Sequence, residues 1–303
     1  MTTRKTDRLT GIVTPLLTPF NDDFSVAEDL YLDHARHCLA QGSHYLSPFG
    51  TTSEALSHSV AERMHLVELL VESGAARPDQ LMPGTGLCNL EETAALCSHA
   101  VDLGCRAVMT LPPFFFVTAS DEGLYRYSSL LIEKVGSDAL TICLYHIPQY
   151  AGIGFTPALA ARLNEAFPEV VTALKDSSGN WENTRAVIEA APGISVFPGS
   201  EGAMLEAMAL GGGGCISASC NSNAAGIRKL YDLARAGDID GAEALRPQID
   251  AHRAAVFAGG LIPGLKALKA QETDDARWLN LRPPLMNAAP DLAAPLAETV
   301  WRG

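Results

Sequence analysis

One lysine in this chain stands where a lysine is unexpected. Residues 170–180 read VVTALKDSSGN, an apolar and β-branched run that ends on Lys175 before the chain turns polar. Burial at the end of such a strand disfavours the charged form of an amine, so Lys175 is a candidate nucleophile. The other five lysines lie in the N-terminal tail or in segments with helical periodicity: Lys5, Lys134, Lys229, Lys266 and Lys269.

A neutral lysine amine can attack a ketone and form a protonated Schiff base, which acts as an electron sink. The adjacent carbon then loses a proton or breaks a carbon–carbon bond. Tyr145 closes the preceding apolar run, TICLYHIP, and could carry that proton. Thr51 and Thr52 offer hydroxyl and backbone N–H groups to a keto-acid carboxylate. Alternatively, Lys175 pairs with a carboxylate inside the core, and Tyr145 is a core residue with a satisfied hydroxyl.

The elements that must position these residues alternate regularly. Short apolar runs, separated by longer segments of helical period, occur at 11–17, 44–50, 81–86, 107–113, 141–148, 171–177, 195–200 and 214–221. This alternation predicts an α/β fold, a closed (β/α)8 TIM barrel whose apolar strands are buried on both faces. An open doubly wound sheet would carry a Gly-rich phosphate turn after its first strand, and TPLLTP at 14–19 is not one.

The strand pattern stops near residue 237. Helical segments at 239–257, 263–271 and 290–301 follow. We therefore expect a catalytic barrel over 1–237 and a C-terminal helical extension over 238–303.

Composition narrows the class of protein. A net charge of −13 argues against nucleic acid and anionic membranes as partners. The N-terminus has no apolar run of a secretory signal, and seven scattered cysteines predict free thiols, so a cytoplasmic protein is expected. No His-x-His pair and no cluster of histidines and carboxylates stands at a strand end, so we expect no metal, and the lysine chemistry implies no cofactor. His34 and His37 are expected on the surface of the first helix.

Four motifs in register resemble the dihydrodipicolinate synthase / N-acetylneuraminate lyase family: GTTSE (50–54), YHIP (145–148), KDSSGN (175–180) and GGCIS (213–217). The resemblance covers nearly the whole chain. It implies a (β/α)8 barrel, usually a homotetramer, that acts on pyruvate or other 2-oxo acids. Lys175 matches the family's Schiff-base lysine and Tyr145 its catalytic tyrosine. Thr51 and Thr52 match the motif that holds the keto-acid carboxylate, and Ile216 matches a position whose backbone lines the pyruvate pocket.

The chain departs from the family where the second substrate binds. In the synthases, an arginine two residues past the proline binds the aldehyde's carboxylate, and here that position is Tyr150. A relay tyrosine contributed across a subunit interface is replaced by the phenylalanines at 114–116, which either form an apolar wall or, as we favour, pack in an interface. Sialic-acid lyases carry neighbouring acidic residues where this chain offers only Glu201, which could bind hydroxyls or cap a helix.

We therefore predict a class I lyase, an aldolase that uses pyruvate or another 2-oxo acid and a hydroxylated or sugar-acid-derived aldehyde. Lys175, Tyr145 and Thr52 are assigned to catalysis. Substrate binding is assigned to Thr51, Thr52, Ile216, Ser217, Glu201 and Ser200. The alternatives are a 2-keto-3-deoxy sugar-acid dehydratase that uses the same enamine, a 4-hydroxy-tetrahydrodipicolinate synthase, which the departures disfavour, and a keto-acid-binding sensor barrel without catalysis.

Overall fold

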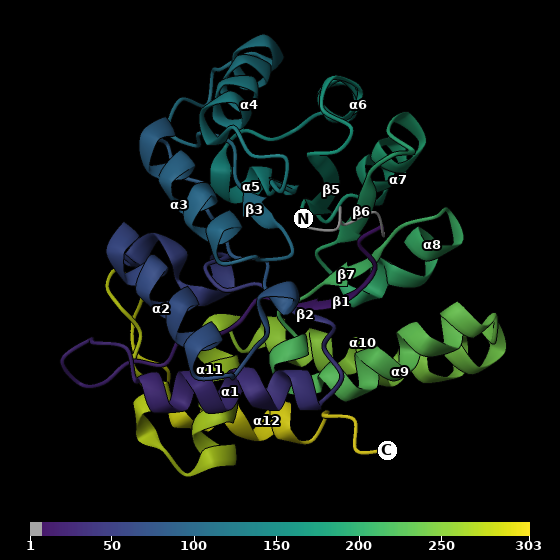
Figure 1. Cartoon of the computed structure of the whole chain (residues 1–303). Helices are drawn as coiled ribbons and strands as arrows, with labels where there is room; N and C mark the ends of the chain where they lie inside the picture. The colour runs from purple at the N-terminus through teal and green to yellow at the C-terminus, as the bar shows by residue number, and fades with distance from the viewer. Residues whose placement is uncertain (1–7) are drawn as a thin grey trace.

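Parallel strands close into a barrel in the computed structural model, which describes residues 8–303 (Figure 1). The regular strands are β1 Gly11–Thr14, β2 Tyr45–Leu46, β3 Val108–Thr110, β4 Ile142–His146, β5 Val171–Asp176, β6 Ser195–Pro198 and β7 Gly214–Ile216. The ring closes because Gly213 N–H donates to Val196 O and Gly11 N–H donates to Gly213 O, both at 2.8 Å. The predicted (β/α)8 barrel is confirmed.

The segment expected as a strand over 81–86 joins the barrel without forming a regular ladder. It makes two isolated parallel bridges, Leu46 to Leu81 and Gly84 to Met109. Pro83 has no N–H to donate. A Cβ at Gly84 would lie 2.0 Å from the carbonyl oxygen of Phe49, so the segment approaches its neighbour too closely for any other residue.

Side chains alternate between the interior of the barrel and the layer beneath the helices. On β4, Cys143 and Tyr145 belong to the interior cluster, whereas Ile142 and Leu144 pack toward the helices. The interior is filled mainly by apolar residues of successive strands, so it is a packed core. Lys175 enters this interior at the carboxyl end of β5, where barrel active sites lie.

Helices surround the barrel and continue past it (Figure 1). Their bounds are α1 Glu28–Ala40, α2 Val60–Glu72, α3 Leu90–Asp102, α4 Asp121–Val135, α5 Pro148–Ala151, α6 Pro157–Ala166, α7 Trp181–Ala190, α8 Met204–Ala209, α9 Cys220–Ala236, α10 Ile239–Ala258, α11 Ile262–Thr273 and α12 Ala293–Ala297. Gly237 ends α9 in the left-handed conformation, with φ 77°. The division into two domains at residue 237 stays a prediction.

The C-terminal helices share a buried cluster with the barrel. Leu17, which follows β1, packs with Val256 of α10, Leu265 of α11 and the indole of Trp278. The extension therefore covers the barrel beside α1 and α9 (Figure 1).

This packing corrects the expectation for His34. Its side chain is buried rather than on the helix surface, and its ring meets Trp278 edge-on at 5.2 Å between centroids. His34 Nε2 lies 2.8 Å from Asn221 Oδ1, which also accepts from Leu17 N–H, so the imidazole donates. Burial lowers the pKa of His34 to about 3 and keeps it neutral. His37 is exposed on the same helix, as expected.

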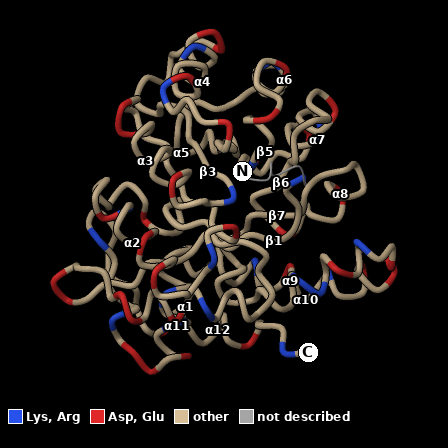
Figure 2. Tube along the Cα trace, in the orientation of Figure 1, with Lys and Arg blue, Asp and Glu red and all other residues tan. Residues whose placement is uncertain are grey.

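The Lys, Arg, Asp and Glu residues lie mainly on the outer helices and loops (Figure 2). Lys5 and the N-terminal segment considered for a secretory signal lie largely outside the described residues. Within residues 8–303, no helix has the length and apolarity needed to cross a bilayer, and no group of three or more His, Cys, Asp or Glu side chains could hold a metal ion. The seven cysteines are free thiols, and all but Cys88 are buried.

Candidate active site

Lys175 and Tyr145 lie side by side on neighbouring strands. The two residues are in register across β4 and β5, so their side chains point to the same face. Both are buried, with 4% and 3% of their surface exposed. Lys175 Nζ lies 4.2 Å from the centroid of the Tyr145 ring, which places the amine over an aromatic face.

Lys175 has no carboxylate partner in the described part of the chain, whereas Lys134, Lys266 and Lys269 each form an ion pair. The next residue, Asp176, is bound on the other side of the strand. Its carboxylate accepts from Ser178 N–H at 2.9 Å and from the side chains of Asn183 and Thr184 at 2.9 and 2.8 Å. The alternative of an ion-paired structural lysine therefore finds no partner among residues 8–303.

The thiol beside the amine is uncharged. Burial raises the pKa of Cys143 to about 12, although the nearby Lys175 side chain acts in the opposite direction. Cys143 therefore supplies no negative charge beside Lys175.

The Tyr145 hydroxyl meets a turn that follows β2. Tyr145 Oη and Thr51 Oγ1 are 3.2 Å apart, and either atom can donate. Thr51 begins a 3-10 helix, Thr51–Ser53, in which Thr52 is buried. The sequence expected these residues to meet, because the carboxyl ends of parallel strands share one rim.

Glu54, directly after this 3-10 helix, fixes the turn to the C-terminal extension. It adopts a left-handed conformation with φ 56°, and its Oε1 accepts from Lys266 Nζ at 2.5 Å. Its Oε2 accepts from Arg282 N–H at 2.9 Å, and Lys266 also donates to Asn280 O at 2.8 Å. The side chains of Glu54 and Lys266 are 1% and 0% exposed, so this ion pair is fully buried. Sequence reasoning missed it, although Lys266 was one of only six lysines.

Glu201 and Ser217 form a separate cluster at the ends of β6 and β7. Ser217 Oγ donates a short hydrogen bond to Glu201 Oε2, and Arg253 of α10 lies 3.5 Å from the same oxygen. Glu201 Oε1 is buried and has no hydrogen-bond partner among residues 8–303. Ser200 accepts from Gly202 N–H at 3.0 Å, so Ser200, not Glu201, caps the short helix that follows. Ile216 is fully buried in the barrel interior.

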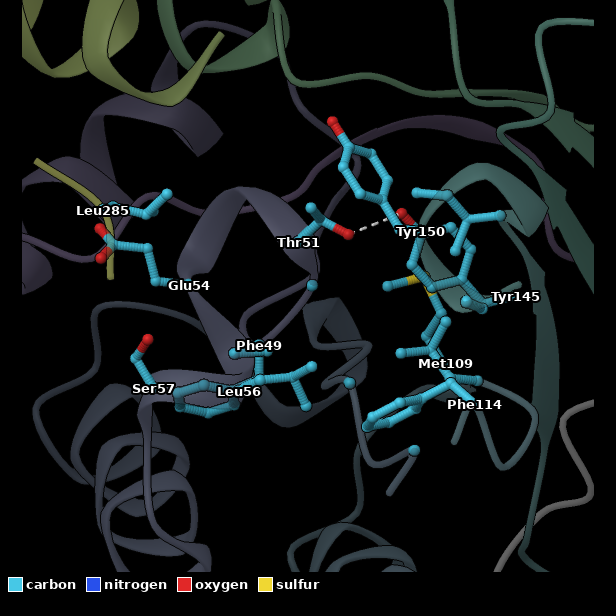
Figure 3. A pocket seen from close by; sticks show the side chains of 17 residues that line it. Phe49, Thr51, Glu54, Leu56, Ser57, Met109, Phe114, Tyr145, Tyr150 and Leu285 are labelled. Atoms are coloured by element: carbon cyan, nitrogen blue, oxygen red, sulfur yellow. Dashed lines mark hydrogen bonds between the residues drawn. The ribbon is translucent and has the colours of Figure 1, made fainter. Parts of the chain in front are cut away.

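A cavity of about 280 Å³ opens beside Thr51 and Tyr145 (Figure 3). Its wall includes Phe49, Leu56, Met109, Leu111, Phe114 and Ile147. The other predicted site residues do not line it: Lys175, Thr52, Ile216, Ser217, Glu201 and Ser200. Tyr145 lines the cavity and also contacts Lys175, so it lies between the two. Sequence reasoning anticipated a possible apolar wall at Phe114 but missed Leu56, Met109 and Leu285.

Comparison with known proteins supplies the family. The model of the Dihydrodipicolinate synthetase family matches residues 8–301. This chain belongs to that family. An uncharacterized DapA-like lyase of Chloroflexus aurantiacus is 32% identical over 295 residues, 96% of this chain and 96% of the relative. A 4-hydroxy-tetrahydrodipicolinate synthase of Thermus thermophilus is 32% identical over 294 residues, 96% of this chain and 95% of the relative.

The fold comparison agrees with the family assignment. The crystal structure of dihydrodipicolinate synthase from Agrobacterium tumefaciens superposes with a TM-score of 0.85 at 30% identity, over 96% of this chain and 98% of that one. Membership in the dihydrodipicolinate synthetase family confirms the resemblance drawn from the four motifs. It also confirms the prediction that the chain is an enzyme of the lyase class.

Proposed function

We propose that this lyase acts on pyruvate through a Schiff base on Lys175. The amine attacks the C2 carbonyl, water leaves, and the resulting iminium makes the C3 protons acidic. Loss of one proton gives an enamine whose C3 attacks the carbonyl carbon of an aldehyde. The observation that carries the proposal is a buried lysine with no carboxylate partner in the described chain, held against the ring of Tyr145.

The neighbouring residues take the roles that this chemistry needs. Tyr145 transfers the protons of Schiff-base formation and enamine formation, and its contact with Thr51 supplies a second hydroxyl for the relay. Thr51 and Thr52 hold the keto-acid carboxylate by hydroxyl and backbone N–H groups, without a cation that would repel the iminium. The backbone at Ile216 bounds the pyruvate on the side of β7.

The prediction of a hydroxylated or sugar-acid-derived aldehyde depends on substrate hydroxyls binding to Ser200, Glu201 and Ser217. Its remaining support is Glu201 Oε1, since Oε2 already accepts from Ser217 and lies near Arg253. A dehydratase acting on 2-keto-3-deoxy sugar acids would use the same enamine. It would also need Glu201 Oε1 to accept a hydrogen bond from a substrate hydroxyl. The synthase reaction has weaker support, because the cavity presents Tyr150 where an arginine would bind a carboxylate.

We also propose a homotetramer in the cytoplasm. Phe115 and Phe116 are 77% and 67% exposed, and Met286 is 81% exposed. The Phe115 and Phe116 rings meet edge-on at 5.5 Å between centroids, and such exposed apolar side chains favour burial against another subunit, which agrees with the interface predicted for the phenylalanines.

Reductive trapping tests the proposal. The protein is incubated with pyruvate and borohydride, digested, and its modified lysine is located by mass spectrometry. We expect one pyruvyl adduct, on Lys175, and loss of both adduct and turnover in Lys175→Met. Lys134→Met is the matched control, since it removes an exposed lysine whose partner is Glu91, and it should keep both.

Absence of any adduct from pyruvate or a longer 2-oxo acid would contradict the Schiff base. Pyruvate binding without turnover or adduct would favour the sensor barrel. An adduct from a longer 2-oxo acid alone would favour the dehydratase.

A further inference from the structure

We propose that Lys266 is a positioning residue for the carboxylate of the keto acid. It acts through Glu54, which directly follows the 3-10 turn that carries Thr51 and Thr52. The inference rests on the proposed function, which assigns the carboxylate to that turn. It adds that the C-terminal extension sets the geometry of the carboxylate site.

The turn lies beyond the regular ladder of the barrel. Strand β2 ends at Leu46, so ladder hydrogen bonds do not hold Thr51 and Thr52 in place. Thr51 and Glu54 extend from the same short turn (Figure 3). The position of the two threonines therefore depends on the contacts that the turn makes with other segments.

The backbone of Glu54 indicates that its carboxylate is needed at this point. Glu54 has φ 56° and ψ 41°, a left-handed conformation that is uncommon for residues other than glycine. Glycine would adopt it without strain, yet a glutamate stands here. Its side chain offsets the strain by accepting from Lys266 Nζ at 2.5 Å and from Arg282 N–H at 2.9 Å. Strain of this kind persists where the surroundings hold a side chain in a functional place.

Lys266 is itself held firmly within the extension. Its Nζ donates to Asn280 O at 2.8 Å and lies 4.4 Å from the centroid of the Phe20 ring. Asn280 Nδ2 donates to Phe20 O at 3.1 Å, which ties the same segment to the chain after β1. The side chains of Lys266 and Glu54 are 0% and 1% exposed, so water does not screen their attraction. The position of α11 is thereby passed to the turn.

Two other cations bind the chain that follows Glu54. Arg63 Nη2 donates to Ala55 O at 2.5 Å, and Arg282 Nη1 donates to Ser57 O at 2.7 Å. These bonds remain when Lys266 is replaced. Loss of Lys266 should therefore displace the turn without unfolding it.

The displacement should weaken carboxylate binding and spare the reactive amine. Lys175 and Tyr145 lie within paired strands, whose backbone hydrogen bonds do not involve the turn. Thr51 and Thr52 have no such support. A misplacement of about 1 Å caused by a change far from the reacting atoms can lower a rate about 10²-fold, so we expect an effect of about tenfold or more.

Reductive trapping with pyruvate and borohydride tests the inference without knowledge of the aldehyde. The variant is Lys266→Met combined with Glu54→Gln, which buries no unpaired charge. The pyruvate concentration that gives half of the maximal adduct on Lys175 should rise at least about tenfold, while saturating pyruvate still gives the adduct. An unchanged concentration would overturn the inference. So would loss of the adduct at every concentration in the folded variant, because Lys175 itself would then depend on the pair.

Methyl pyruvate gives a readout that a general loss of stability does not move. It has the reacting carbonyl of pyruvate but no carboxylate, and both compounds react with the same folded molecules. The ratio of the half-saturating concentration of methyl pyruvate to that of pyruvate should fall at least about tenfold in the double variant. An unchanged ratio would contradict the positioning role. A ratio near one in the unaltered protein would instead refute the carboxylate site assigned to Thr51 and Thr52.

Leu268→Ala is the matched control for stability. Leu268 is buried on the same helix, in the apolar cluster with Trp278, and that cluster includes no residue of the segment 51–58. The variant leaves a cavity in the extension and should keep both trapping values. Equal changes in this control and in the double variant would overturn the inference. Absence of an adduct in the unaltered protein would overturn the Schiff base itself, so the two failures are distinguishable.

Discussion

Replacing Lys266 by methionine should destabilise the protein far more than any exposed lysine does. The variant removes the cation paired with Glu54, whose side chain is 1% exposed, and also the donor to Asn280 O. Breaking a buried ion pair from one side costs about 3–5 kcal/mol, because the remaining charge is left without compensation. Methionine keeps most of the volume, so the loss reports chiefly on the orphaned carboxylate.

Urea unfolding followed by circular dichroism measures this loss. With a slope of about 3 kcal/mol per molar urea for a chain of this size, the midpoint should fall by about 1–1.7 M. Lys134→Met is the control, since Lys134 and Glu91 form an exposed pair worth about 0–1 kcal/mol. Adding Glu54→Gln to Lys266→Met should restore about 2 kcal/mol, because the double variant buries no unpaired charge.

Equal destabilisation by Lys266→Met and Lys134→Met would refute the reasoning. So would a double variant less stable than Lys266→Met, since both results would mean that the buried carboxylate does not need its cation.

Two other changes have defined outcomes. Tyr145→Phe keeps the ring over Lys175 but removes the hydroxyl that meets Thr51, so aldol turnover should fall by about 10²–10⁴-fold in steady-state assays; unchanged turnover would remove Tyr145 from proton transfer. Burial lowers the pKa of His34 to about 3, so from pH 6.5 downward the unfolded chain binds a proton that the folded chain does not, and stability falls. His34→Gln can keep the donor to Asn221 and should reduce the loss in the free energy of unfolding between pH 6.5 and 4.5 by about 2 kcal/mol; an unaltered pH profile would contradict a neutral buried imidazole.

The barrel could be predicted because its signal is local. Each strand buries both faces and each helix buries one, so the apolar pattern reveals the alternation without any knowledge of long-range contacts. The segment at 81–86 shows the limit: its apolar pattern is that of a strand, but Pro83 and the close approach of Gly84 to Phe49 prevent a regular ladder.

The meeting of Lys175, Tyr145 and Thr51 could also be predicted, since parallel strands bring their carboxyl ends to one rim. The sequence could not predict which of the polar residues at that rim line the same cavity. Glu201 and Thr51 both follow strands, yet only Thr51 lines the cavity, because Ser217 and Arg253 bind the Glu201 carboxylate on another side of the barrel.

The eightfold alternation, the strand-end lysine and the residues around it follow from the amino-acid sequence, because periodicity and strand direction depend on neighbours in the chain. Three features follow from the three-dimensional fold: Lys266 binds Glu54 across 212 residues, Trp278 covers His34, and the space beside Tyr145 is mainly apolar. These features arise when distant segments bury each other's side chains, and no local pattern specifies the partner that a buried charge or a cavity wall will meet.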